Sequence, residues 1–227
     1  MGDIIKWQYD QKKITADQAA AMVKSGDQIA YGEFTMFPHA LDEALAKRVN
    51  ELQDVKVTGV CYTSPPQVVL ADPKREHFVL TDLHFGIVSR KLHDHNLCKY
   101  IPNTYHQGSR IIKKYYDIDV GFFSVSPMDA RGYFNLGPSN SITPAVMEKT
   151  KIKIVEVNHS VPVCLGGNQE SVHISQVDYV VEGNNTPLRQ LSPAVPTATE
   201  QKIADILIKE IEDGACLQLG IGGLPNA

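Results

Sequence analysis

Hydrophobic positions along the chain follow two periodicities, one typical of helices and one typical of buried strands. Between Leu41 and Leu52, apolar residues recur every three or four positions, which places them on one face of a helix. The apolar runs at 28–34, 55–63 and 151–158 are rich in residues that favour strands. This alternation predicts an α/β fold with a largely parallel sheet covered by helices on both faces.

The middle of the chain shows the same alternation less regularly. Residues 77–83 and 119–125 have the composition of strands, and 87–97 is compatible with a helix. Pro144 predicts the start of a short helix, because proline is favoured in the first helical turn. Residues 98–116 fit neither pattern, and no element is predicted for them.

Two capping boxes indicate where helices begin. In 15–18 and in 197–200, a threonine is followed three positions later by Gln or Glu. In this pattern, each of the two side chains accepts a hydrogen bond from the backbone N–H group of the other residue at the helix start. After the second box, one apolar face is formed by Ile203, Ala204, Leu207, Ile208 and Ile211. We therefore predict a helix that ends near Gly214 and is followed directly by a strand at 216–220.

A segment with two prolines, 192–197, predicts a domain boundary. We expect a first domain over residues 1–194 and the opening of a second, similar domain over 195–227. One helix, one strand and a glycine loop are too few residues to bury a core, so the sequence is expected to be part of a longer protein. Pro225 agrees with this expectation, because proline fits the first turn of a helix that would continue beyond it.

Charge and composition indicate which kinds of molecule the protein binds. The net charge is -4, with 22 Lys and Arg scattered among 26 Asp and Glu, so no basic patch favours nucleic acid or a membrane surface. No apolar run is long enough for a signal peptide or a membrane span. Cysteines 61, 98, 164 and 216 are far apart and are expected to be reduced, packed thiols. We predict a cytoplasmic protein whose partners are small molecules or copies of itself.

Two segments have residues suited to ligand binding. The glycines of 220–223 follow a predicted strand, and without Cβ atoms they let backbone N–H groups approach a phosphate, a thioester or an oxyanion. The alternative is that they are ordinary turn glycines. The polar segment 124–141 leaves a predicted strand, where α/β sheets bind ligands. Its alternative is a β-hairpin whose aromatic residues pack and whose glycines turn.

Histidine and cysteine patterns give weaker hypotheses. His93 and His95, with His84 nearby, suggest a metal, but no third ligand has a recognisable spacing, so we predict surface or capping histidines and no metal site. Cys61 and Cys164 are candidate nucleophiles, but their apolar neighbours favour packed thiols. The residues alone therefore predict an α/β enzyme acting on small molecules.

Three stretches carry a resemblance to a known family. SPMDARGYFNLGPSNS, IVEVNHSVP and PTATEQKIADILIKEIEDGACLQLGIGGLPNA together resemble the acetyl-CoA hydrolase/transferase family. Within it, the chain is most similar to butyryl-CoA:acetate and 4-hydroxybutyrate CoA-transferases. The resemblance runs along nearly the whole chain and is most specific in the last stretch. It implies a class I CoA-transferase-like fold with two similar α/β domains.

The resemblance also implies where the chemistry lies. The nucleophile of the family is a glutamate one helix and one strand beyond the glycine loop, so we expect it downstream of Ala227 and no catalytic residue in this chain. Ser139 and Asn140 are expected to face the acyl carboxylate. The residues that match the CoA-binding loop of the family are Gly220, Ile221, Gly222, Gly223 and Leu224.

The implied reaction is ping-pong transfer of CoA between a short-chain acyl-CoA and acetate through a glutamyl-CoA thioester. CoA is then a substrate and covalent intermediate, and no permanently bound cofactor is expected. The expected partners are acyl-CoA, short-chain carboxylates, the C-terminal remainder of the same protein and further copies in a homo-oligomer. Two alternatives stay open, a thioester hydrolase and a non-catalytic CoA-binding fragment.

Overall fold

A computed structural model describes residues 2–167, 169–190, 195–220 and 222–227. The side chains of residues 2 and 3 are outside this description. None of the helices in these ranges is both long enough and apolar enough to cross a membrane. The chain divides into two compact units, Met1–Leu188 and Arg189–Ala227, which are described separately.

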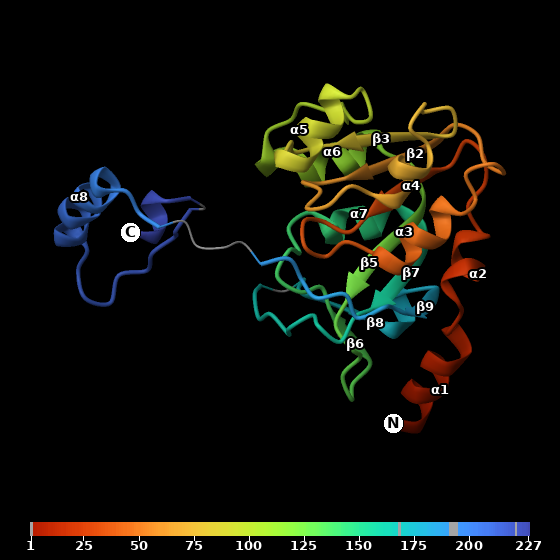
Figure 1. Cartoon of the computed structure of the whole chain (residues 1–227). Coiled ribbons are helices and arrows are strands. Elements are labelled where there is room, and N and C mark those ends of the chain that lie inside the picture. Colours follow the sequence, from red (N-terminus) through yellow and green to blue (C-terminus); the bar gives the residue numbers. More distant parts are fainter. Residues whose placement is uncertain (1, 168, 191–194, 221) are drawn as a thin grey trace. The chain divides into compact units, whose positions relative to one another are not determined.

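The first unit is built around a seven-stranded sheet in the order β4-β3-β2-β1-β5-β7-β9 (Figure 1). Each pair of neighbouring strands is parallel, as the sequence predicts. The strands are β1 (Gln28–Tyr31), β2 (Val55–Gly59), β3 (Phe78–Asp82), β4 (Lys99–Tyr100), β5 (Ile118–Val125), β7 (Thr150–Val157) and β9 (Tyr179–Glu182). A second, two-stranded sheet pairs β6 (Tyr133–Asn135) with β8 (Ser171–His173) in antiparallel orientation.

Helices connect these strands. The α-helices of the first unit are α1 (Gly2–Lys12), α2 (Ala16–Ala20), α3 (His39–Ala46), α4 (Gln67–Ala71), α5 (Ile87–Asp94), α6 (Gly108–Tyr115) and α7 (Thr143–Lys149). Two short 3-10 helices are η1 (Tyr105–Gln107) and η2 (Ile174–Gln176). The predicted capping box at Thr15 and the proline-initiated helix at Pro144 are both confirmed.

The seven-stranded sheet separates two apolar cores. Consecutive side chains of a strand point to opposite faces, so Tyr31 and Phe122 join one core while Ala30 and Phe123 join the other. The first core is covered by α2, α3, α4 and α5, and the second by α6, α7 and the β6-β8 pair. The prediction of a sheet covered on both faces is therefore confirmed.

The structure differs locally from the sequence prediction in three places. The unplaced segment 98–116 contains β4, η1 and α6. β4 and η1 are too short for a periodic pattern to be visible, whereas α6 is as long as α5 and was missed although its apolar residues lie on one face. The run 28–34 stops being a strand at Tyr31, because Gly32 begins the turn described below. In 124–141, β6 pairs with the distant β8, so the two strands of a local hairpin are not formed.

The second unit contains α8 (Ala198–Leu207) and the 3-10 helices η3 (Ile208–Glu210) and η4 (Leu224–Asn226). Its capping box is confirmed, since the Glu200 N–H donates to Thr197 Oγ1 at 3.2 Å. The predicted helix end near Gly214 is wrong, and the predicted strand at 216–220 is not formed. A strand requires a hydrogen-bonded neighbour, and no strand occurs among the described residues of this unit.

Candidate functional site

The site is sought at the edge of the sheet where the parallel strands end. Strands β2, β3 and β4 lie on one side of β1, and β5, β7 and β9 on the other. The order therefore reverses between β1 and β5. In open α/β sheets, ligands bind beyond the carboxyl ends of the strands at such a switch point, which draws attention to the segment that follows β1.

The segment 32–36 turns tightly over the end of β1. The Gly32 N–H donates to the Phe122 carbonyl at 2.9 Å, and the Phe34 N–H donates to the Val60 carbonyl at 3.0 Å. A Cβ atom at Gly32 would lie 2.2 Å from the Met36 carbonyl oxygen, so no other residue fits this turn. The turn is thereby fixed to the neighbouring strands on both sides.

Glu33 is a buried carboxyl group within this turn. Its side chain is bonded through Oε1, which accepts hydrogen bonds from the Ile142 N–H at 2.8 Å and the Thr143 hydroxyl at 3.0 Å. Its Oε2 is buried and has no hydrogen-bond partner among the described residues. Burial raises the pKa of Glu33 to about 7, although the hydrogen bonds from Thr143 and Ile142 act in the opposite direction. Glu33 thus changes charge near neutral pH.

Four side-chain hydroxyls lie around this turn in two pairs. Thr35 Oγ1 and Ser139 Oγ are 3.1 Å apart, although 104 positions separate them in the sequence. Tyr105 Oη and Ser141 Oγ are also hydrogen-bonded. We call these four residues the hydroxyl cluster. It combines the end of β1, the 3-10 helix η1 and the loop that precedes α7.

Strained backbone gathers at the same place. Three non-glycine residues here have positive φ angles: Phe34 at 48°, Cys61 at 54° and Ser141 at 24°. Such conformations are uncommon for these residue types and concentrate at functional sites. The His84 ring lies 6.2 Å from the Phe34 ring and 6.4 Å from the Tyr105 ring, centroid to centroid. Aromatic side chains therefore border the hydroxyl cluster.

The structure separates the two predicted substrate residues. Ser139 belongs to the hydroxyl cluster, but the Asn140 side chain donates through Nδ2 to the Gln169 carbonyl at 2.9 Å. Its Oδ1 is buried without a hydrogen-bond partner in the described chain. Sequence reasoning missed Glu33 and Tyr105. An acidic residue that follows an apolar strand and a glycine is a signal for the first, whereas Tyr105 lies in the segment where no element was predicted.

The predicted CoA-binding loop lies in the second unit, and Ile221 is outside the described residues. Gly222 has a φ of 147°, a conformation that favours glycine. A Cβ atom at Gly223 would lie 2.4 Å from Glu200 Oε1, so the loop contacts the start of α8. Leu224 begins η4, and a Cβ atom at Gly220 would lie 3.6 Å from Pro225 Cγ. Binding of CoA by these residues stays a prediction.

The histidines and cysteines are dispersed. His93 Nδ1 lies 3.0 Å from the Cys98 carbonyl oxygen, and no group of three metal-ligating side chains occurs within the described ranges. Burial raises the pKa of the Cys61 thiol, which makes it a poorer nucleophile at neutral pH. Cys216 is exposed, so the prediction of a packed thiol is wrong there, because the strand that was to bury it is not formed.

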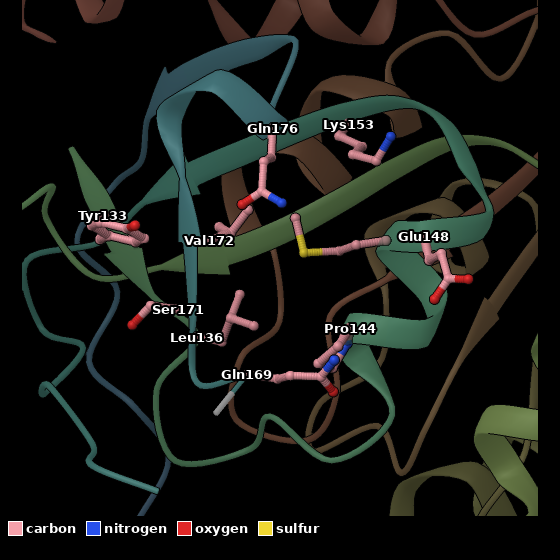
Figure 2. Close-up of a pocket in the computed structure, with 10 residues that line it drawn as sticks. Tyr133, Leu136, Pro144, Glu148, Lys153, Gln169, Ser171, Val172 and Gln176 are labelled. Atoms are coloured by element: carbon pink, nitrogen blue, oxygen red, sulfur yellow. The ribbon is translucent and has the colours of Figure 1, made fainter. Parts of the chain in front are cut away.

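A separate hollow of about 480 Å³ lies between α7, β7 and the β6-β8 pair (Figure 2). Its volume is in the range of small-molecule pockets. Its charged side chains are engaged, since Lys153 Nζ donates to the Thr150 carbonyl at 2.8 Å and Glu148 pairs with Lys113 at 2.5 Å. None of the predicted site residues lines it. The carboxyl edge remains the better candidate.

Comparison with known proteins agrees with the resemblance in the sequence. Residues 4–191 match the acetyl-CoA hydrolase/transferase N-terminal domain. The chain is 42% identical over 224 residues to butyryl-CoA:acetate CoA-transferase of Anaerostipes caccae, covering 98% of this chain and 50% of that protein. It is 42% identical over 221 residues to a probable butyrate:acetyl-CoA coenzyme A-transferase of Syntrophomonas wolfei, covering 97% and 49%.

The fold agrees as well. The crystal structure of RipA from Yersinia pestis matches with a TM-score of 0.87 and 30% identity, over 97% of this chain and 53% of that chain. This chain spans about half the length of the curated relatives it matches. The matched domain, the identity of the relatives and the shared sheet lead to one conclusion: the chain belongs to the acetyl-CoA hydrolase/transferase family.

Proposed function

We propose that this chain is the N-terminal part of an enzyme that transfers CoA between a short-chain acyl-CoA, such as butyryl-CoA or 4-hydroxybutyryl-CoA, and acetate. The observation that carries the proposal is the 42% identity, over nearly the whole chain, to a protein named butyryl-CoA:acetate CoA-transferase. Residues 195–227 then open a second domain similar to the first. The remainder of that domain and further copies of the protein are its partners.

The proposed mechanism is ping-pong. A glutamate downstream of Ala227 attacks the acyl-CoA thioester and forms an acyl-glutamyl anhydride and CoA thiolate. The thiolate attacks the glutamyl carbonyl, which releases the carboxylic acid and leaves a glutamyl-CoA thioester. Acetate reverses both steps and leaves as acetyl-CoA. The glycine loop contributes backbone N–H groups to CoA or to the tetrahedral oxyanion, and Ser139 and Asn140 contribute to the site of the acyl carboxylate.

The test uses the complete protein, with this chain and its C-terminal remainder. Incubation with butyryl-CoA alone, followed by denaturing mass spectrometry, should show a CoA-sized adduct on the polypeptide. Addition of isotope-labelled acetate should then give labelled acetyl-CoA. Release of CoA at the same rate without any acid would instead identify a thioester hydrolase. Absence of both adduct and turnover would leave a CoA-binding protein and contradict the proposed transferase.

A further inference from the structure

We propose that the hydroxyl cluster binds the carboxylate group of the acid substrate, and that Glu33 is the positioning residue beneath it. This inference rests on the proposed function, which identifies the acid as the small carboxylate that accepts CoA. The inference assigns a binding site for that carboxylate in this chain. It also gives a role to a buried carboxyl group that is not needed to complete the sheet.

The hydroxyl cluster has the chemistry to bind a carboxylate. Each hydroxyl has a single proton to donate and rotates to aim it. In the Thr35–Ser139 pair, only one partner donates to the other, so one O–H group is left for a ligand. Ser141 is hydrogen-bonded to Tyr105 and also interacts with the Glu33 carboxyl group, which ties the second pair to Glu33. The Tyr105 side chain is 50% exposed and Ser141 is also exposed, so a small anion reaches the cluster from solvent.

Glu33 holds the two halves of the cluster together. Its backbone lies two positions before Thr35, and its Oε1 fixes Ile142 and Thr143, the residues directly after Ser141. The carboxyl group is only 1% exposed and its Oε2 has no partner in the part of the chain that the structure describes. A buried carboxyl group in this state favours its neutral form. The neutral form places no negative charge of Glu33 beneath the cluster.

Ionisation of Glu33 would place a negative charge under the bound carboxylate and weaken binding. The titratable group that faces Glu33 is the Tyr105 phenol of η1, which in turn faces the Cys61 thiol after β2. At the end of β3, His84 borders the cluster, and the buried Asp82 accepts hydrogen bonds from the Cys61 and His84 N–H groups. Burial raises the pKa of both Cys61 and Tyr105, so both are neutral when Glu33 begins to ionise. Neither of them therefore accounts for a loss of affinity on the alkaline side of neutrality, and the Glu33→Gln variant below isolates the contribution of Glu33.

The experiment is a titration of the isotope-labelled 227-residue chain with sodium acetate, followed by NMR, with sodium chloride as the reference at equal ionic strength. Acetate is ionised at both about pH 6 and about pH 8.5, so its own charge does not change. We expect acetate to shift the signals of the hydroxyl cluster and its affinity to fall about fivefold between the two pH values. Shifts confined to other parts of the chain, or reproduced by chloride, would overturn the inference.

Variants separate the two roles. Ser139→Ala and Thr35→Val each remove a donor and should weaken acetate binding about fivefold. Ser175→Ala, whose exposed hydroxyl contacts His173, is the matched control and should bind normally. Glu33→Gln imitates the neutral carboxyl group and should retain binding while losing the pH dependence. If the acetate affinity of the wild-type chain did not depend on pH, the role of Glu33 would be refuted even if the Gln variant did not fold.

Failure of this inference can be told apart from failure of the proposed function. Acetate binding at the hydroxyl cluster without CoA transfer in the complete protein would contradict the transferase and leave the carboxylate site. CoA transfer in the complete protein with no acetate-dependent shift at the cluster would contradict the carboxylate site and leave the transferase.

Discussion

The Leu41 N–H donates to Glu156 Oε2 at 3.0 Å, a hydrogen bond that joins the first turn of α3 to β7 across 115 positions of sequence. Asp42 makes a similar connection, since its Oδ2 accepts from the Gln67 N–H at 2.6 Å. Together with Glu33, these residues form a set of three buried carboxyl groups that accept hydrogen bonds from backbone N–H groups of distant segments. Each therefore stabilises long-range packing.

These carboxyl groups make the stability of the fold depend on pH. Burial raises the pKa of Glu33, Asp42 and Glu156 to about 7 each, above the value of 4.5 or 3.8 in an unfolded chain. The folded state then binds protons more tightly than the unfolded state. Their contribution is fully present below about pH 4 and is lost as the pH rises through 7. We expect the unfolding free energy to decrease by about 1 kcal/mol per group between pH 6 and pH 8.

Urea unfolding at a series of pH values measures this decrease. Asp72, Asp119, Asp129 and Glu182 act in the opposite direction at low pH, because hydrogen bonds lower the pKa of each against the effect of burial. The comparison is therefore made above about pH 6, where these groups are ionised. Glu156→Gln should reduce the slope in this range. A stability that is constant or rises from pH 6 to pH 8 would refute the prediction.

Tyr31→Phe should destabilise the first unit by about 1 to 3 kcal/mol. The buried Tyr31 hydroxyl donates to Asp42 Oδ1 at 3.0 Å, and its loss leaves that oxygen with only the long contact from the Val68 N–H at 3.4 Å. The ring itself packs against Phe37 and Phe122 and is retained. Chemical denaturation measures the change. Tyr133→Phe, on an exposed ring, is the control, and an equal effect in both variants would contradict the explanation.

Sequence periodicity predicted the sheet well because its strands are buried on both faces. About half of the residues in runs such as 119–125 and 151–158 are β-branched or aromatic, and these runs became β5 and β7. Periodicity failed where pairing is set by distant residues. The partner of β6 is β8, and nothing in either sequence identifies the other. The strand expected at 216–220 failed for a related reason, since its residues have the right composition but no neighbouring strand among the described residues of the second unit.

The candidate site was predictable only in part. Ser139 was predicted from its place in a polar segment after a strand, and it lies at the carboxyl edge. The neighbouring Asn140 shares that segment but its amide is bonded to Gln169. Neighbouring residues in a loop can point their side chains in different directions, and the local sequence does not predict which direction each one takes. Glu33 depends on contacts with Ile142 and Thr143, more than a hundred positions away, and only the fold brings them together.

Gly222→Val should lower acyl transfer in the complete enzyme. Gly222 has a φ of 147°, which a β-branched residue adopts only with strain, and the glycine loop is proposed to present its N–H groups to CoA or the oxyanion. The N–H group is kept in valine but displaced by the strain, and failure of one such donor to reach its acceptor lowers kcat about a hundredfold or more. Steady-state kinetics with butyryl-CoA and acetate measures it. Unchanged turnover in a folded variant would contradict the role of the loop.

Gly121→Ala should destabilise the fold, because Gly121 lies in the middle of β5, against the side chains of Phe123 and Thr150. An added Cβ atom would be 2.4 Å from Phe123 Cε2 and 2.9 Å from Thr150 Cγ2. Phe123 is fully packed in the second core, so the ring has little room to move away. Overpacking of this kind costs about 1 to 3 kcal/mol. Thermal or urea unfolding measures the loss.

Gly167→Ala is the matched control for this change. Gly167 lies in an exposed loop, has no described heavy atom within 4 Å of an added Cβ atom, and does not have a positive φ. Alanine restricts the unfolded chain more than glycine does, so this variant should be unchanged or more stable by up to about 1 kcal/mol. If Gly121→Ala were as stable as Gly167→Ala, the close packing of β5 against β7 would not require glycine. The space between these strands would then not explain why residue 121 is a glycine.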